Sequence, residues 1–319
     1  MSGPWDRPLH PENFIEIEDE PDNWGDDEDW NPDYEDGHSS NVFPIHAGPG
    51  PGDARVTAND RAETDVHPIS EDAAFVFFVA FGADPDEIDV STERHRVEDV
   101  PEELEIALTG RDTVLGFFAP PIGDLLREDS PDLVELASSV GTCIIISGGF
   151  EDPLDLEYLR NSIGVATAMV DAGAVAIYNL QNFTLFSANE WRREIFKPDR
   201  PPTEAFVRVL WSDESDEHET NDEAEHLGER PATVWVHTRG LRTFGRPDLS
   251  VRGVPVKDRE RAGKFCSLVA DQLVRGLDIA DGAQMDIGVG LGAVTFSRGG
   301  DINDPDFNNV HLEVHWPSN

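Results

Sequence analysis

The pattern of apolar positions changes at about residue 70. Before that point Pro, Asp, Glu, Gly and Asn predominate, and no stretch could bury enough apolar surface to offset the entropy lost on ordering. From residue 73 onward, apolar runs recur along the rest of the chain. We therefore predict a disordered acidic N-terminal tail over residues 1–70 and an α/β body over residues 71–319.

Short apolar runs bounded by Gly, Pro or charged residues predict strands within the body. These are residues 73–82, 112–122, 141–149, 174–180, 204–212 and 231–240, followed by short ones at 283–290, 293–300 and 309–316. Apolar residues at helical spacing predict helices at 132–140, 154–173, 187–196 and 256–282. This order predicts an α/β (α+β) fold, with one or more mixed sheets covered by helices. It allows one compact body or two packed halves that divide near residue 200.

The charge of the chain narrows its range of partners. The formal net charge is -41, with 65 Asp and Glu against 24 Lys and Arg. Nucleic acids are bound largely by neutralising phosphates with Lys and Arg, and anionic membranes attract the same side chains, so neither partner is expected. Basic proteins or cations are favoured instead. The acidity fits a salt-rich cytoplasm, and the preference for Arg over Lys equally fits a GC-rich genome; the sequence leaves both explanations open.

Few features point to a membrane, an oxidising compartment or a cofactor. Cys143 and Cys266 each lie in an apolar run, which is typical of small buried side chains rather than of a disulfide or a zinc site. The first residues lack a basic start followed by an apolar stretch, and no apolar run reaches the length of a spanning helix. We expect a cytoplasmic protein without metal, cofactor or membrane partner.

The tail carries aromatic residues that a purely solvating segment does not need. Trp24, Trp30 and Tyr34 interrupt a nearly continuous acidic stretch. Either the tail only keeps the protein in solution, or it docks on its own body or on a partner.

Several motifs resemble ligand sites but fit simpler structures better. Ser147, Gly148 and Gly149 follow an apolar run as a phosphate loop does, but acids crowd the next helix, so a glycine turn is favoured. Glycines at 288, 290 and 292 precede another strand rather than the helix of a dinucleotide site. The Asp- and Asn-rich segments 29–33 and 301–306 lack the glycine and terminal acid of a calcium loop. His311 and His315 are too far apart along a strand to share a metal.

One short segment concentrates positive charge in this acidic chain. His237, Arg239, Arg242 and Arg246 lie within ten residues, and Asp248 follows them. Gly240, Gly245 and Pro247 shape the segment as a turn. Arginines on such turns recognise carboxylates or phosphates, and they also fix turns by pairing with acids of their own chain. Both interpretations stay open.

Residues 111–255 show a recognisable order of motifs. The run GFFAPPIG is followed by IIISGGFEDPL, by the small-residue segment NSIGVATAMVDAGAVAIYN, and by HTRGLRTFGRPDLSV. This order resembles the uncharacterised bacterial "domain of unknown function 4261" family, most specifically in the last motif. The resemblance covers a little under half of the chain. It implies an α/β domain without established chemistry, related to bacterial immunity or interaction proteins.

Two functions remain as hypotheses. The first is a non-enzymatic interaction domain, similar to an immunity or regulatory protein, that binds a basic protein partner. The second is an enzyme or a small-anion-binding protein that uses the turn from His237 to Arg246. No catalytic residue is assigned.

Overall fold

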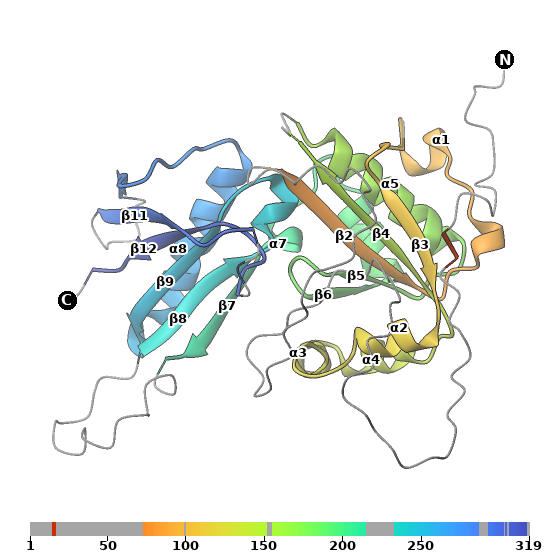
Figure 1. Ribbon diagram of the computed structural model, residues 1–319, viewed down its shortest axis with the longest axis horizontal. Coiled ribbons are helices and arrows are strands. Elements are labelled where there is room, and N and C mark those ends of the chain that lie inside the picture. The colour runs from red at the N-terminus through yellow and green to blue at the C-terminus, as the bar shows by residue number, and fades with distance from the viewer. Residues whose placement is uncertain are drawn as a thin grey trace, which may run out of the picture.

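The computed structural model describes residues 15–16, 73–98, 100–151, 155–214, 233–286, 293–302, 304 and 306–317. It contains two six-stranded sheets with helices, so the predicted α+β class is confirmed (Figure 1). Apart from Ile15–Glu16, the predicted tail lies outside the described residues, as do the Asp- and Asn-rich segment 29–33 and the glycines at 288, 290 and 292.

The first sheet has the strand order β1-β3-β4-β2-β5-β6. Its strands are β1 (Ile15–Glu16), β2 (Ala74–Phe81), β3 (Glu105–Thr109), β4 (Cys143–Phe150), β5 (Ala176–Asn179) and β6 (Thr184–Ser187). All pairs are antiparallel except the short pairing of β1 with β3, which is parallel. The sheet is therefore mixed at one edge only.

Both faces of the first sheet are covered. Ala74, Val76 and Phe78 of β2 belong to a core shared with α5 (Glu157–Asp171). Phe75 and Phe77 belong to a second core on the opposite face. That core is closed by α2 (Arg111–Gly116), α3 (Ile122–Asp129) and α4 (Pro131–Ser138), which lie below the sheet in Figure 1. Burial on both sides explains why β2 is apolar at every position rather than alternating.

The second sheet has the strand order β10-β11-β12-β9-β8-β7. Its strands are β7 (Arg208–Asp213), β8 (Thr233–Arg239), β9 (Asp248–Pro255), β10 (Gln284–Met285), β11 (Val294–Gly299) and β12 (His311–His315). β12 pairs parallel with β9, and the other pairs are antiparallel. Helix α8 (Arg259–Val274) covers one face, on which Val234 and Val236 are buried.

The remaining elements are short and connect the layers. They are α1 (Thr92–His95), α6 (Ala188–Glu190), α7 (Thr203–Phe206), the 3₁₀ helices η2 (Pro85–Glu87), η4 (Leu241–Phe244) and η5 (Val256–Asp258), and the π-helix η3 (Trp191–Phe196). The first sheet ends at Ser187 and the second begins at Arg208, yet one hydrophobic core cluster contains residues of both. We call the parts on either side of residue 200 the first and second halves.

The predicted strand at 112–122 is wrong. This segment contains helix α2 and the start of α3. Val114, Phe117 and Phe118 are buried together while Leu115 and Gly116 are exposed, which is the spacing of a helix face. A short apolar run does not separate a buried strand from a buried helix, and here the helix forms.

Two other predictions need correction. Residues 203–206 form helix α7, so the strand predicted at 204–212 starts only at Arg208. Gly148 and Gly149 lie within strand β4 rather than in a turn. A Cβ at Gly148 would lie 2.6 Å from the carbonyl oxygen of Glu103, so close backbone approach, not a turn, accounts for glycine there.

Candidate functional site

The basic segment predicted from the sequence, residues 237–248, comprises the end of β8, the connection to β9 and the start of β9, and we call it the basic turn. His237 and Arg239 lie in β8, Arg242 lies in the 3₁₀ helix η4, and Asp248 begins β9. Gly240 and Gly245 flank the helix with φ of 112° and 61°, which favour glycine. A Cβ on Gly240 would lie 2.0 Å from the carbonyl oxygen of Phe206, so the backbones of η4 and α7 approach too closely for any other residue. The turn is thus packed directly against α7.

Asp248 is the buried centre of this turn. Its carboxylate accepts hydrogen bonds from Thr238 Oγ1 at 2.9 Å, Asn309 Nδ2 at 2.8 Å and the Leu241 amide at 3.3 Å. Burial raises the pKa of Asp248 to about 6, although these hydrogen bonds and the charge of Arg239 favour ionisation. The carboxylate has its hydrogen bonds within the chain and reaches no solvent.

Arg239 and Arg242 are held by backbone carbonyls and aromatic rings of their own chain. Arg239 donates to the Asp306 carbonyl and lies over the ring of Phe183, 4.2 Å from its centre. Arg242 donates to the Asn308 carbonyl at 2.7 Å and is buried. Burial lowers the pKa of both, that of Arg242 to about 10, so Arg242 stays charged at neutral pH.

His237 is buried between aromatic rings. It stacks on Trp235 with ring centres 4.1 Å apart and meets Phe307 edge-on at 5.6 Å. Burial, together with the charges of Arg239 and Arg252, lowers the pKa of His237 to about 3. The imidazole is therefore neutral at physiological pH.

Arg246 is half-buried. Its carbonyl oxygen accepts a hydrogen bond from Asn309 Nδ2 at 2.9 Å. Within the part of the chain that the structure describes, its guanidinium has no hydrogen-bond or ion-pair partner.

Further contacts connect this turn to the first half of the chain. Tyr158 of α5 donates its hydroxyl proton to the Thr243 carbonyl at 2.8 Å. The ring of Phe244 packs edge-on against Phe206, and that of Phe206 packs against Phe78 of β2. The structure therefore brings Arg239, Arg242 and Asp248 together in the interior, where they hold parts of the chain against one another. None of the three lines the pocket beside α5 that is described below.

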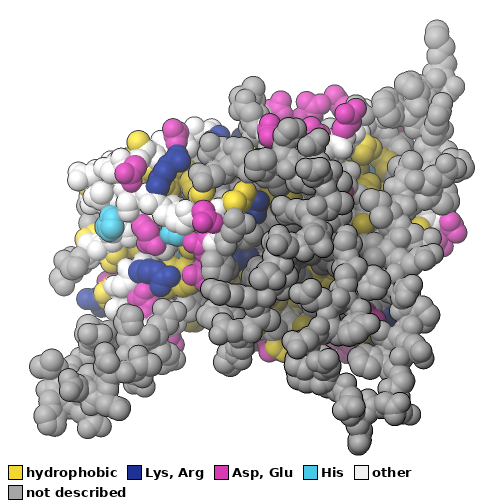
Figure 2. All heavy atoms as spheres, in the orientation of Figure 1, with side chains coloured by type: hydrophobic (Ala, Val, Ile, Leu, Met, Phe, Trp, Pro, Cys, Tyr) yellow, Lys and Arg dark blue, Asp and Glu magenta, His cyan; other side chains and the backbone are white. Residues whose placement is uncertain are grey.

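The face of the second sheet opposite α8 carries a layer of rings and charges that the sequence analysis did not single out. His311 stacks on Phe307 with ring centres 4.4 Å apart, and its Nε2 lies 3.2 Å from Glu313. Burial alone would raise the pKa of Glu313, but hydrogen bonds from His311 and Ser250 and nearby positive charges lower it. Figure 2 shows acidic, basic and histidine side chains side by side on this half. In the sequence, the alternation of Val234 and Val236 with Trp235 and His237 indicated that the two pairs lie on opposite faces of a strand.

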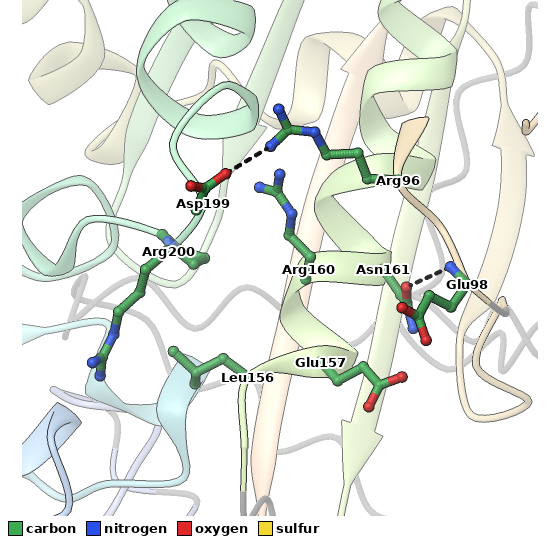
Figure 3. Close-up of a pocket in the computed structure, with 9 residues that line it drawn as sticks. Arg96, Glu98, Leu156, Glu157, Arg160, Asn161, Asp199 and Arg200 are labelled. Carbon is green, nitrogen blue, oxygen red and sulfur yellow. Dashed lines mark hydrogen bonds and ion pairs between the residues drawn. The ribbon is translucent and has the colours of Figure 1, made fainter. Parts of the chain in front are cut away.

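A pocket of about 230 Å³ opens in the first half beside the start of α5 (Figure 3). Its lining contains three arginines that the sequence analysis also did not single out, Arg96, Arg160 and Arg200. They are separated by up to about a hundred residues in the sequence, and only the fold brings them together. No local motif therefore indicates the pocket.

Other candidate chemistries lack their usual geometry among the described residues. Burial raises the pKa of the Cys143 thiol to about 11 and that of Cys266 to about 12, so neither forms a thiolate readily. No group of three or more His, Cys, Asp or Glu in the described ranges is arranged to hold a metal ion. His311 contacts Glu313, whereas His315 contacts Ser297, so the two histidines act separately. None of the described helices is both long and apolar enough to span a bilayer.

Comparison of the chain with protein-family models, with curated proteins and with solved structures found no match.

Proposed function

We propose that the protein is a non-enzymatic interaction domain that binds a basic protein partner in the cytoplasm. The supporting observation is an excess of exposed carboxylates over arginines between residues 84 and 135 of the first half. The resemblance of residues 111–255 to the family of unknown function 4261, and the relation to immunity or regulatory proteins that it implies, belong to the same proposal.

The exposed arginines between residues 84 and 135 make ion pairs or hydrogen bonds within the chain, although that of Arg96 is exposed to water. The exposed arginines pair as follows: Arg94 with Asp89, Arg96 with Asp199, Arg127 with Asp124, and Arg111 with the carbonyls of Ser138 and Val140. In contrast, Glu102, Glu103 and Glu105 are exposed, and no basic group of the described residues lies within ion-pair distance of them. Their charge is available to a partner.

The position of these three carboxylates favours protein recognition. Glu105 begins β3, which lies next to the edge of the first sheet, and Glu102 and Glu103 precede it. Clustered charges at a rim raise association rates and select partners of opposite charge rather than adding much affinity. Binding should therefore weaken steeply as salt rises.

The alternative, an enzyme or anion-binding protein built on the turn from His237 to Arg246, has less support. Arg239, Arg242 and Asp248 already make hydrogen bonds within the chain, and burial keeps His237 neutral. An anion at this turn would have to break those contacts first.

The test replaces Glu102, Glu103 and Glu105 by glutamine. The control carries Glu204→Gln, Glu260→Gln and Asp278→Asn, which remove the same charge from exposed positions elsewhere. Captured proteins from native lysate are quantified at low and high salt for the wild type and both variants. We expect a salt-sensitive basic protein that the first variant loses and the control retains. Equal loss from both variants, or no basic protein bound by the wild type, contradicts the proposal.

A further inference from the structure

The pocket beside α5 holds two guanidinium groups close together. Arg96 follows α1, and Arg160 lies in the first turn of α5. Both lie over the ring of Phe196, at 5.3 Å and 5.5 Å from its centre. Figure 3 shows the two groups on the same side of the pocket, next to Asp199. The fold thus holds two like charges in one place.

The positive charge on this side is only partly neutralised. Arg96 pairs with Asp199 at 3.5 Å, and the Asp199 side chain is fully exposed, so water weakens this contact. The carboxylates of Glu98 and Glu157 point away from the guanidiniums in Figure 3. Arg200 also points away, toward the Val274 carbonyl. Burial and the charge of Arg96 lower the pKa of Arg160, while the charge of Asp199 raises it.

One donor of the pair has no acceptor. Arg160 Nη1 donates to the carbonyls of Phe196 at 3.0 Å and Pro198 at 2.9 Å, which fixes the guanidinium in place. Arg160 Nη2 is shielded from solvent and has no hydrogen-bond partner in the described structure. Buried donors are nearly always paired, so an unpaired one beside a cavity indicates a missing acceptor.

We infer that this pocket binds a small oxyanion, a carboxylate or a phosphate, between Arg96 and Arg160. Such a group offers two or more oxygens in the spacing that guanidinium groups match. The ligand would take the place of Asp199, which can swing into solvent. A volume of about 230 Å³ lies below the roughly 300–1,000 Å³ of drug-sized ligand sites, so the bound species is small.

The backbone conformation at Arg96 allows a glycine substitution without strain. Its φ is 55°, in the left-handed region where glycine is preferred over a residue with a side chain. Arg96→Gly therefore removes one guanidinium while relieving the backbone. This relief offsets the loss of its exposed contacts with the Lys197 carbonyl, Asp199 and Phe196, so we expect its unfolding temperature to stay near that of the wild type. Arg94→Gln is the matched control, because Arg94 is exposed, pairs with Asp89 and does not line the pocket.

The experiment is isothermal titration of the full chain with sodium phosphate and, separately, with sodium acetate, against chloride at the same ionic strength. We expect one of the two ions to bind at a single saturable site, at least tenfold more weakly in Arg96→Gly and within twofold of wild type in Arg94→Gln. Whichever ion binds identifies the class of oxyanion. Absence of saturable binding of either ion, or equal weakening in both variants, overturns the inference. Because no basic protein is involved, this result is independent of the interaction proposed above.

Discussion

Arg242 lies over the ring of Phe75, with its guanidinium carbon 4.8 Å from the ring centre. Phe75 belongs to β2 in the first sheet, and Arg242 belongs to η4 between two strands of the second. The contact therefore joins the halves through a cation–π interaction, and the hydrogen bond from Arg242 to the Asn308 carbonyl extends it into the loop before β12.

Removing this connection should destabilise the protein. We expect Arg242→Ala to lower the free energy of unfolding by about 1–3 kcal/mol, because a largely desolvated cation–π contact and a charged hydrogen bond are lost together. Arg246→Ala removes the same charge from the same turn but no described contact, so its effect should stay within about 0.5 kcal/mol. Denaturant unfolding of both variants measures the difference, and equal effects would refute the assigned role of Arg242.

The approach of η4 to α7 gives a second prediction. At Gly240, φ is 112° and a Cβ would meet the Phe206 carbonyl at 2.0 Å. At Gly276, φ is 100° but nothing lies within 4 Å of a Cβ. Both alanine variants bear the backbone cost of about 1 kcal/mol, and only Gly240→Ala adds the clash. We expect Gly240→Ala to be at least about 2 kcal/mol less stable than Gly276→Ala in thermal or denaturant unfolding.

The buried carboxylate of Asp248 predicts a pH dependence. Because the folded-state pKa is raised from 3.8 to about 6, the folded protein binds the proton more tightly than the unfolded chain. The contribution of Asp248 to stability is then complete below pH 4 and is lost as pH rises through 6, a change of about 3 kcal/mol. The unfolding free energy of the wild type minus that of Asp248→Asn should fall by most of this amount between pH 4 and 7. A difference that stays constant with pH would contradict the raised pKa.

His237 predicts a dependence of the opposite sign. Its folded-state pKa is lowered to about 3, so below pH 6.5 only the unfolded chain takes up the proton. Compared with His237→Phe, which keeps an aromatic ring on Trp235, the wild type should lose about 1.4 kcal/mol of stability per pH unit between pH 6 and 4.5. The imidazole Cε1 resonance of His237 should not move between pH 8 and 4.5; a shift in that range would show that the ring titrates.

The charge of the body predicts a response to salt. Residues 71–319 carry 47 Asp and Glu against 21 Lys and Arg, a net charge of -26. Since repulsion among these charges is screened by ions, the unfolding midpoint should rise from low to molar potassium chloride. The measurement uses the full chain, and a flat or falling midpoint would contradict the prediction.

Much of the first half could be predicted from the sequence because its strands are buried on both faces. Residues 74–81 and 143–150 are apolar runs in the sequence for this reason, and the buried apolar residues of α5 recur at helical spacing. The segment 112–122 was assigned wrongly because the apolar residues of a short helix buried on one side can also follow one another closely in the sequence. Strand β3 was missed because it begins at the exposed Glu105, just after other exposed acids, so its apolar run is short.

The sites were less accessible to sequence analysis. The concentration of arginine near residue 240 was visible, but whether the groups face solvent or carbonyls such as those of Asp306 and Asn308 depends on a loop more than sixty residues away. Arg96 and Arg160 lie in unrelated segments, and only the path of η3 brings Phe196 beneath both. Side chains that meet through tertiary packing leave no local pattern.

The position of β12 has a consequence for biosynthesis. This strand lies inside the second sheet, between β9 and β11, although both of these neighbours precede it in the sequence. During translation, β7, β8 and β9 emerge first and leave the inner edge of β9 without its parallel neighbour until residue 315 has left the ribosome. Long-range parallel pairing is slow, and an open strand edge invites wrong pairing in the meantime. Nascent chains halted before β12 should therefore aggregate or recruit chaperones, whereas those extended past it should not.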